Sequence, residues 1–279
     1  EKYKVNKISI FGNTRTRDKV IRREIKIKEQ DPYSGTKIKS SKRFINRRGF
    51  FESVDIKEVP SKDKPNYLDV EVTVEEKPTG YFSIQGGYSS VEALLLGVQV
   101  QENNLWGYGK QLGASITVGT VSQNFLIDYG DPYFLDTTYQ FRMSLFKRKY
   151  EFIDYDREKW GGTLLFGKEL NTWTFADIKY RYENIEVDDL TTEATEVFQE
   201  SKDKISSISL GMRYDTRDNF LDPTRGISTS FSIEESNSYL GANLHFTEYT
   251  GKFSKYFEIT RDHTMAYSFE SAFIDFRNT

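Results

Sequence analysis

From Gly80 to its last residue the chain alternates apolar and polar residues, and this pattern restricts the possible folds more than any other feature. In residues 112–118, apolar Leu112, Ile116 and Val118 alternate with small polar residues. Successive side chains of a strand point to opposite faces, so the pattern predicts strands with one apolar and one polar face. About eleven such strands are expected, including those at residues 94–101, 139–145, 176–183, 208–214 and 227–234.

The polar faces of these strands are strongly charged, which bears on what surrounds them. A soluble barrel fills its interior with apolar side chains. Here we expect the apolar face to meet lipid and the polar face to line a wet lumen, in strands near the roughly 9–11 residues that cross a bilayer. A soluble β-sandwich with solvated charges is the alternative, although its strands are seldom so long. The charged positions are Arg142, Lys179, Arg181, Glu183, Arg213, Glu234 and Lys252.

The connections between the strands also favour a membrane barrel. Tight turns rich in Gly, Pro, Asn and Asp are predicted to alternate in sequence with longer, more charged stretches, as in bacterial outer-membrane barrels. The longer stretches are expected at residues 147–159 and 188–204. The tight ones are expected at residues 102–110, 131–137, 169–172, 222–226 and 259–263.

Composition excludes several other classes of protein. The chain has no Cys, two His and a net charge of −3, so disulfides, thiolate chemistry and nucleic-acid binding are not expected. No apolar run approaches the roughly 18–20 residues of a membrane-spanning helix, and no signal peptide follows Glu1. Asp215 and Asp218 flank a turn, which explains them better than a hydrolase does. We therefore expect no enzyme, no metal site and no cofactor.

Residues 1–79 differ from the rest and predict a separate domain. They hold 20 Lys and Arg against 13 Asp and Glu, a net charge of +7, while the remainder carries −10. Strands are expected at residues 5–11, 51–59 and 66–75. One helix would begin at a Thr16 cap with Asp18 in its first turn, and a second would span residues 36–48. The order β-α-α-β-β predicts a small sheet covered on one face by two helices.

Several motifs carry a resemblance to a known family. Residues 5–25 (VNKISIFGNTRTRDKVIRREI), 47–59 (RRGFFESVDIKEV) and 67–80 (YLDVEVTVEEKPTG) are similar to the last POTRA domain of the BamA family. Residues 102–112 (ENNLWGYGKQL), 128–134 (DYGDPYF) and 214–226 (YDTRDNFLDPTRG) are similar to that superfamily's early barrel turns. Each motif is weak alone, and their order and spacing over nearly the whole chain carry the match.

The resemblance implies a mostly β fold, with a periplasmic POTRA domain at residues 1–79 and an antiparallel transmembrane β-barrel from residue 80. About eleven of roughly sixteen barrel strands would be present, so we read the sequence as truncated. Arg48-Gly49-Phe50 shares letters with a family lumen-loop motif but lies at a helix end. A TamA-like factor or a two-partner secretion transporter of the same superfamily, and a passive porin, remain alternatives.

The implied function is to fold and insert β-barrel proteins into the outer membrane of a Gram-negative cell. The implied partners are unfolded outer-membrane protein clients, lipoprotein subunits of an assembly complex and outer-membrane lipids. A client strand would add to a lateral seam of the barrel, and strand-interior glycines weaken the first barrel strand. The candidate gate residues are Gly80, Tyr81, Phe82, Ser83, Ile84, Gln85, Gly86, Gly87 and Tyr88.

A second candidate site is the expected edge of the POTRA sheet. Its strand could receive client or partner strands in the same way, although charges on an edge also block such pairing. The glycines of the first barrel strand have a competing explanation too, which is relief of crowding in the lumen. The edge residues are Phe51, Glu52, Ser53, Val54, Asp55, Ile56 and Lys57.

Overall fold

The computed structural model describes residues 3–191, 199–219, 222–260 and 263–277. They form two compact units, which are described separately. The first comprises residues 1–82 and 100–112, and the second residues 83–99 and 113–279. Within the described part of the chain, no helix is both long and apolar enough to cross a membrane.

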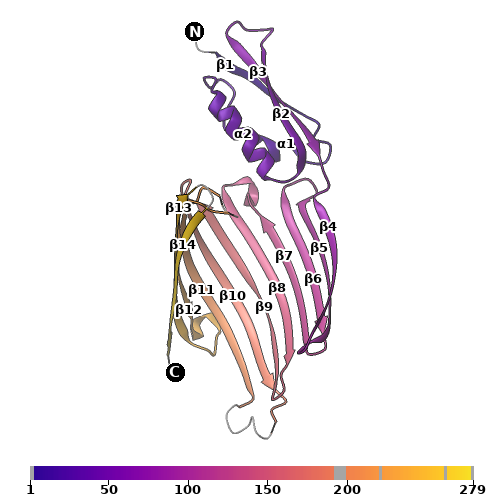
Figure 1. Cartoon of the computed structure of the whole chain (residues 1–279), viewed down its shortest axis with the longest axis vertical. Coiled ribbons are helices and arrows are strands. Elements are labelled where there is room, and N and C mark those ends of the chain that lie inside the picture. Colours follow the sequence, from indigo (N-terminus) through magenta and orange to yellow (C-terminus); the bar gives the residue numbers. More distant parts are fainter. Residues whose placement is uncertain (1–2, 192–198, 220–221, 261–262, 278–279) are drawn as a thin grey trace. The chain divides into compact units, whose positions relative to one another are not determined.

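The first unit, called the front unit below, contains a three-stranded sheet and two helices. Strand β3 lies between the other two strands, parallel to β1 and antiparallel to β2 (Figure 1). The observed order β-α-α-β-β is the predicted one. Its elements are β1 (Lys4–Phe11), α1 (Asp18–Arg22), α2 (Gly35–Arg47), β2 (Phe51–Pro60) and β3 (Tyr67–Glu76).

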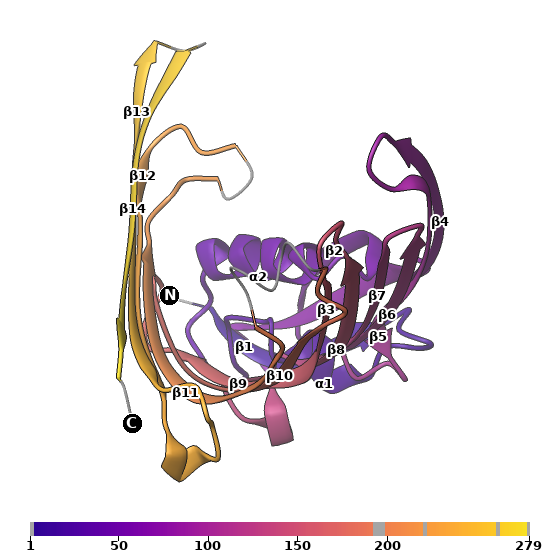
Figure 2. The same cartoon turned by 90° about the horizontal axis from the view of Figure 1, so that it is seen from below.

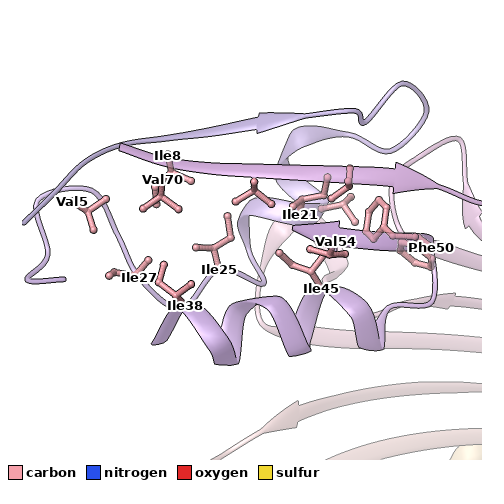
Figure 3. Packing of buried hydrophobic residues seen from close by; sticks show 14 residues of the cluster. Val5, Ile8, Ile21, Ile25, Ile27, Ile38, Ile45, Phe50, Val54 and Val70 are labelled. Atoms are coloured by element: carbon pink, nitrogen blue, oxygen red, sulfur yellow. The ribbon is translucent and has the colours of Figure 1, made fainter. Parts of the chain in front are cut away.

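One hydrophobic core holds the front unit together. Val5, Ile45 and Val72 are fully buried, and they come from β1, α2 and β3. Figure 3 shows their neighbours between the sheet and α2, including Ile21, Ile25 and Val54. Each aliphatic side chain buried in this way stabilises the fold by about 1.5–3 kcal/mol. The apolar residues that alternate along the strands and those that recur along the helices of residues 1–79 therefore pack into a single core.

The predicted cap of the first helix is wrong. Arg17, not Thr16, is the N-cap residue of α1, and it makes no side-chain cap bond. Thr16 is buried instead, because its hydroxyl accepts a hydrogen bond from Asn104 and its amide donates to Glu76. A partner distant in the sequence thus replaces the local cap. Ser34, by contrast, caps α2 by accepting a hydrogen bond from the Lys37 amide.

The second unit contains most of an eleven-stranded sheet whose strands follow one another in chain order from β4 to β14. The sheet is strongly curved (Figure 2). Its strand number and the antiparallel pairing agree with the sequence-based prediction. The strands are β4 (Gly80–Ser89), β5 (Ala93–Leu105), β6 (Lys110–Gly119), β7 (Ser122–Asp131), β8 (Tyr139–Glu151), β9 (Asp156–Glu169), β10 (Thr174–Asp188), β11 (Ser201–Asp215), β12 (Gly226–Ser236), β13 (Phe246–Thr260) and β14 (His263–Phe276).

Burial distinguishes the two faces of this sheet. Apolar Ile178, Leu210 and Met212 are exposed, whereas charged Glu183 and Glu234 are buried. Side chains crowd together on the concave face of a curved sheet and spread apart on its convex face. The charged face is therefore the inner one, and the outer face presents apolar side chains, as expected of a barrel wall in lipid.

The expected alternation of short and long connections is only partly correct. The long stretch expected at residues 147–159 is a connection of residues 152–155 alone, because its charges lie within β8 and β9. There they form cross-strand ion pairs, Lys147 with Glu158 at 2.9 Å and Lys149 with Asp156 at 3.0 Å. The β11–β12 connection, expected to be tight, runs from residue 216 to 225. The long connection after β10 spans residues 189–200, of which 192–198 lie outside the described residues.

Candidate functional site

Strand β4, the candidate gate, lies at one edge of the eleven-stranded sheet. Its one strand neighbour in the sheet is β5, so the other side of its backbone is not covered by a strand within the described residues. Phe82, Ile84 and Tyr88 are strongly exposed on one face. On the other face, the Tyr81 hydroxyl donates a hydrogen bond to the Gln101 side chain at 2.6 Å. Such an edge is a template for pairing with another strand.

Crowding by the residues that the structure describes does not explain Gly86 and Gly87 of β4. A Cβ atom added at Gly87 would meet nothing within 4 Å, and one at Gly86 would make an ordinary contact with Leu96 at 3.7 Å. Gly80 differs, because its Cβ would lie 2.9 Å from a Glu102 carboxylate oxygen. Side chains would therefore fit at positions 86 and 87. Glycine there lowers the strand preference of β4 without relieving a clash.

Strand β2, the second candidate site, is an edge of the front sheet. It carries devices that oppose strand addition. Its pairing with β3 shifts register between Phe51 and Ser53, and Asp55 forms ion pairs with Lys42 at 3.5 Å and Lys57 at 3.9 Å. Bulges and edge charges both discourage pairing. Apolar Phe51 and Val54 point into the core, while Glu52 is exposed.

Sequence reasoning missed a cluster within the front unit that joins the segment before α1 to the β5–β6 turn. We call this turn, residues 104–109, the clamp turn. The Asn104 side chain is buried, donating to the Thr16 hydroxyl at 2.8 Å and accepting from the Gly109 amide at 2.7 Å. The Arg17 amide donates to the Gly107 carbonyl at 2.9 Å. One asparagine thus shapes the turn and attaches it to the segment before α1.

Close approach explains a glycine of the clamp turn. Gly107 has φ +75°, and a Cβ atom there would lie 2.0 Å from the Arg15 carbonyl oxygen. Any other residue would push the turn away from Arg15 and the segment before α1. Tyr108 lies between Gly107 and Gly109 in the sequence. Two cations lie over its ring, with Arg17 at 5.0 Å and Lys19 at 5.2 Å from the ring centre. Residues 106–109 (WGYG) therefore contribute packing contacts as well as forming the turn.

Glu76, the last residue of β3, holds the opposite side of the same segment. Its carboxylate accepts hydrogen bonds from the amides of Thr14, Arg15 and Thr16 and from the Thr14 hydroxyl. Partial burial raises the pKa of Glu76, but these hydrogen bonds outweigh it and lower the pKa from 4.5 to about 2. After Glu76 only Lys77, Pro78 and Thr79 precede β4. The segment before α1 is thus fixed between the end of β3 and the clamp turn.

Comparisons with known proteins now decide the family. An Omp85 superfamily domain matches residues 104–275, which is more than half of the chain. The chain belongs to the Omp85 superfamily. A POTRA model, described as a surface antigen variable number repeat, matches residues 3–77. These matches confirm the POTRA-plus-barrel architecture inferred from the sequence.

Curated relatives of this Omp85 chain include BamA outer-membrane protein assembly factors. The relative from Nitratidesulfovibrio vulgaris is 25% identical over 267 residues, covering 95% of this chain and 34% of its own length. That from Neisseria meningitidis is 32% identical over 130 residues, covering 47% of this chain and 16% of its own length. The chain thus spans about a third or less of these relatives.

Solved structures show the same fold at lower identity. BamA from Haemophilus ducreyi lacking POTRA domains 1–3 aligns with 99% of this chain and 56% of its own length, at a TM-score of 0.75 and 21% identity. CdiB from Acinetobacter baumannii aligns with all of this chain and 53% of its own length, at a TM-score of 0.61 and 12% identity. Both solved structures therefore show the fold alone. The family models together with the curated BamA relatives confirm the sequence-based resemblance to BamA-type proteins.

The inner face of the Omp85 sheet is braced by ion pairs over β9–β12. Glu234 accepts from the Arg181 guanidinium at 2.8 Å and from the Ser207 hydroxyl at 2.6 Å. Glu183 pairs with Lys159 at 3.1 Å. Removing one partner of such a buried pair leaves an uncompensated charge. These contacts therefore tie β9–β12 to one another in a braced wall.

Two acidic groups outside this wall have structural explanations. Asp218 organises the β11–β12 connection, because its carboxylate accepts from the Thr224 amide, the Thr224 hydroxyl and the Arg225 amide. Asp215 binds the neighbouring Arg217 side chain at 2.6 Å. These contacts agree with the turn interpretation of both aspartates. Elsewhere, the carboxylates of Asp156, Asp188 and Asp189 come within 4.8 Å of one another. Lys149 pairs with the first of them, and exposed acidic groups often gather without an ion.

Proposed function

We propose that this chain is the membrane-proximal part of an outer-membrane protein assembly factor, with its front unit in the periplasm. The β4 edge is the template on which a client strand first pairs. The observation that carries the proposal is that β4 is an edge strand with glycines at positions 86 and 87, where a Cβ atom would meet no clash among the described residues. The 25% identity with the BamA assembly factor of Nitratidesulfovibrio vulgaris over 95% of the chain supports it.

The proposed reaction is an exchange of backbone hydrogen bonds. Lipid offers no partners for free N–H and C=O groups, so a client strand must enter the membrane already paired. Addition to β4 satisfies one side of that strand while its apolar side chains meet lipid. This step needs no catalytic residue and no cofactor. Unfolded outer-membrane proteins are the proposed clients, and lipoprotein subunits are proposed to bind the periplasmic part.

A cysteine crosslink tests the template. The chain has no native Cys, so Ser83→Cys or Gln85→Cys in β4 gives a single reactive thiol. A client with one Cys in its last strand should form a disulfide with β4 during insertion by the intact factor. The matched control is Ser230→Cys in β12, a strand paired on both sides. Equal crosslinking at Ser230 and at the β4 positions would refute templating at this edge.

A second test separates this function from passive conduction. In the intact protein, a disulfide that joins β4 to the strand closing the barrel should stop client insertion and leave the folded protein in the membrane. Restoration by a reducing agent is the control. A locked protein that inserts clients normally would exclude the seam, and a large single-channel conductance without insertion activity would favour a porin.

A further inference from the structure

Helix α2 carries an excess of positive charge that its own unit does not neutralise. Residues 32–51 contain six Lys and Arg and no Asp or Glu. Three of these six form ion pairs, namely Lys37 with Asp31, Lys42 with Asp55 and Arg48 with Glu24. Lys39, Arg43 and Arg47 form no ion pair within the described residues. All three are exposed.

The spacing of these three residues makes the excess unfavourable for the helix alone. Lys39, Arg43 and Arg47 follow one another at intervals of four, so they lie along one face of α2. Like charges at this spacing destabilise a helix by a few tenths of a kcal/mol per pair. Neither helix stability nor an ion pair among the described residues explains the row.

Three cations converge on a single ring beside this row. Lys26 Nζ lies 4.3 Å from the centre of the Phe44 ring, and the guanidinium carbons of Arg43 and Arg47 lie 5.7 and 5.6 Å from it. Lys26 is held against α2 because its amide donates to the Ser41 hydroxyl at 2.8 Å, and Ser41 is fully buried. The site, called the Phe44 cluster, is Lys26, Lys39, Arg43, Phe44 and Arg47.

We infer that the Phe44 cluster binds the phosphate groups of anionic phospholipids at the membrane surface. Converging cations beside an aromatic ring are suited to a lipid head group, since the cations pair with phosphate and the ring tolerates the interface. Two features favour a lipid surface as the binding partner, namely the positive charge of the cluster and the short link between β3 and β4. Only residues 77–79 separate β3 of the front unit from β4 of the Omp85 sheet, so the helix stays within reach of the bilayer. The inference rests on the sheet spanning the membrane and not on the seam mechanism.

A fluorescent label on α2 tests the inference in the intact protein. Asn46→Cys places a polarity-sensitive dye on the exposed side of the helix, in a chain without other cysteines. The labelled protein is placed in nanodiscs of phosphatidylcholine with rising fractions of phosphatidylglycerol. The dye emission should shift to the blue as the anionic fraction rises, and salt should reverse the shift. Each cation near an anionic surface contributes about 1 kcal/mol, or about fivefold in affinity, so Arg43→Gln with Arg47→Gln should weaken docking about 25-fold.

The matched control changes the same charge elsewhere on the front unit. Lys62→Gln with Lys64→Gln alters the exposed β2–β3 connection and should leave the shift unchanged. An unchanged urea midpoint shows that the α2 variant folds. An emission that ignores phosphatidylglycerol overturns the inference, as does a shift that survives the α2 variant. Equal competition by free inorganic phosphate would assign a phosphate-ion site instead, and a shift produced only by an acidic protein would assign a protein partner.

Discussion

Glu76 shows how one carboxylate at a strand end fixes a segment of the front unit. It receives hydrogen bonds from Thr14, Arg15 and Thr16, and those groups prefer the charged form of the acid. The sequence gives no hint of this contact, because Glu75 and Glu76 are alike as letters. Glu75 is exposed and accepts a hydrogen bond from Ser53. The alternation of β3 indicated which side each residue faces, but not which one the Thr14–Thr16 segment would reach.

The lowered pKa of Glu76 predicts a loss of stability in acid. Its folded pKa of about 2 lies below the ordinary value of 4.5, so its contribution is complete above pH 4.5 and is lost as the pH falls toward 2. After allowance for solvent screening we expect about 1–2 kcal/mol. The measurement is the urea midpoint of the front unit at pH 7 and pH 3. Glu76→Gln should lower the midpoint at pH 7 and reduce the difference between the two pH values.

Glu75→Gln is the matched control for this prediction. It makes the same chemical change one residue away, on a side chain that does not contact residues 14–16. Its midpoint should stay near that of the unchanged protein at pH 7. Equal losses in both variants would mean that general charge, rather than the Glu76 hydrogen bonds, sets the acid sensitivity.

At the scale of elements, the strands were predictable and the clamp turn was not. Period two is a local signal, so eleven strands could be expected from the sequence alone. The many charged residues at 147–159 suggested a long loop, but in the structure they lie within β8 and β9 and form cross-strand ion pairs. The Asn104–Thr16 hydrogen bond joins residues 88 positions apart. No local pattern reveals such a contact, although the resemblance of residues 102–112 to a family turn marked the right segment.

Asn104 predicts how firmly the clamp turn is attached. Asn104→Leu removes both side-chain hydrogen bonds from a buried site, and we expect a loss of about 2–3 kcal/mol. Asn104→Asp should keep the bond from the Gly109 amide and lose the donation to Thr16. Hydrogen exchange by mass spectrometry distinguishes the two cases. Residues 104–109 and 14–17 should exchange faster in the Leu variant, while the Asp variant should affect mainly residues 14–17.

An unchanged exchange pattern in both Asn104 variants would contradict the clamp. The assay itself is checked at Asn171 in the β9–β10 turn, whose side chain accepts hydrogen bonds from the Trp173 and Thr174 amides. Asn171→Ala should speed exchange at residues 170–174 and leave residues 14–17 as they were. A response of the front segment to Asn171→Ala would show that turn loss anywhere in the chain has the same effect.

Across the Omp85 sheet, the strands differ in how firmly they are bound to their neighbours. Strands β9–β12 are tied by long antiparallel pairings and by the Glu183 and Glu234 ion pairs. Strand β4 has one strand neighbour among the described residues and carries Gly86 and Gly87, where a side chain would fit without a clash. The other edge, β14, contains no glycine. Edge position alone therefore does not account for the composition of β4, and a strand that must separate easily would have this composition.

The glycines of β4 predict a trade between stability and insertion. Gly86→Ala with Gly87→Ala should fit without a clash and stabilise β4 by about 0.5–1 kcal/mol per site. Because a firmer seam opens less often, client insertion should slow by about fivefold to 30-fold if the full gain resists opening. Hydrogen exchange of β4 should slow in parallel. The matched control is Gly251→Ala in β13, another site with nothing within 4 Å, where insertion should be unchanged. Faster hydrogen exchange of β4 in the double variant would contradict the prediction, as would normal insertion despite slower exchange. Either result would mean that the edge position of β4, and not its glycines, accounts for templating.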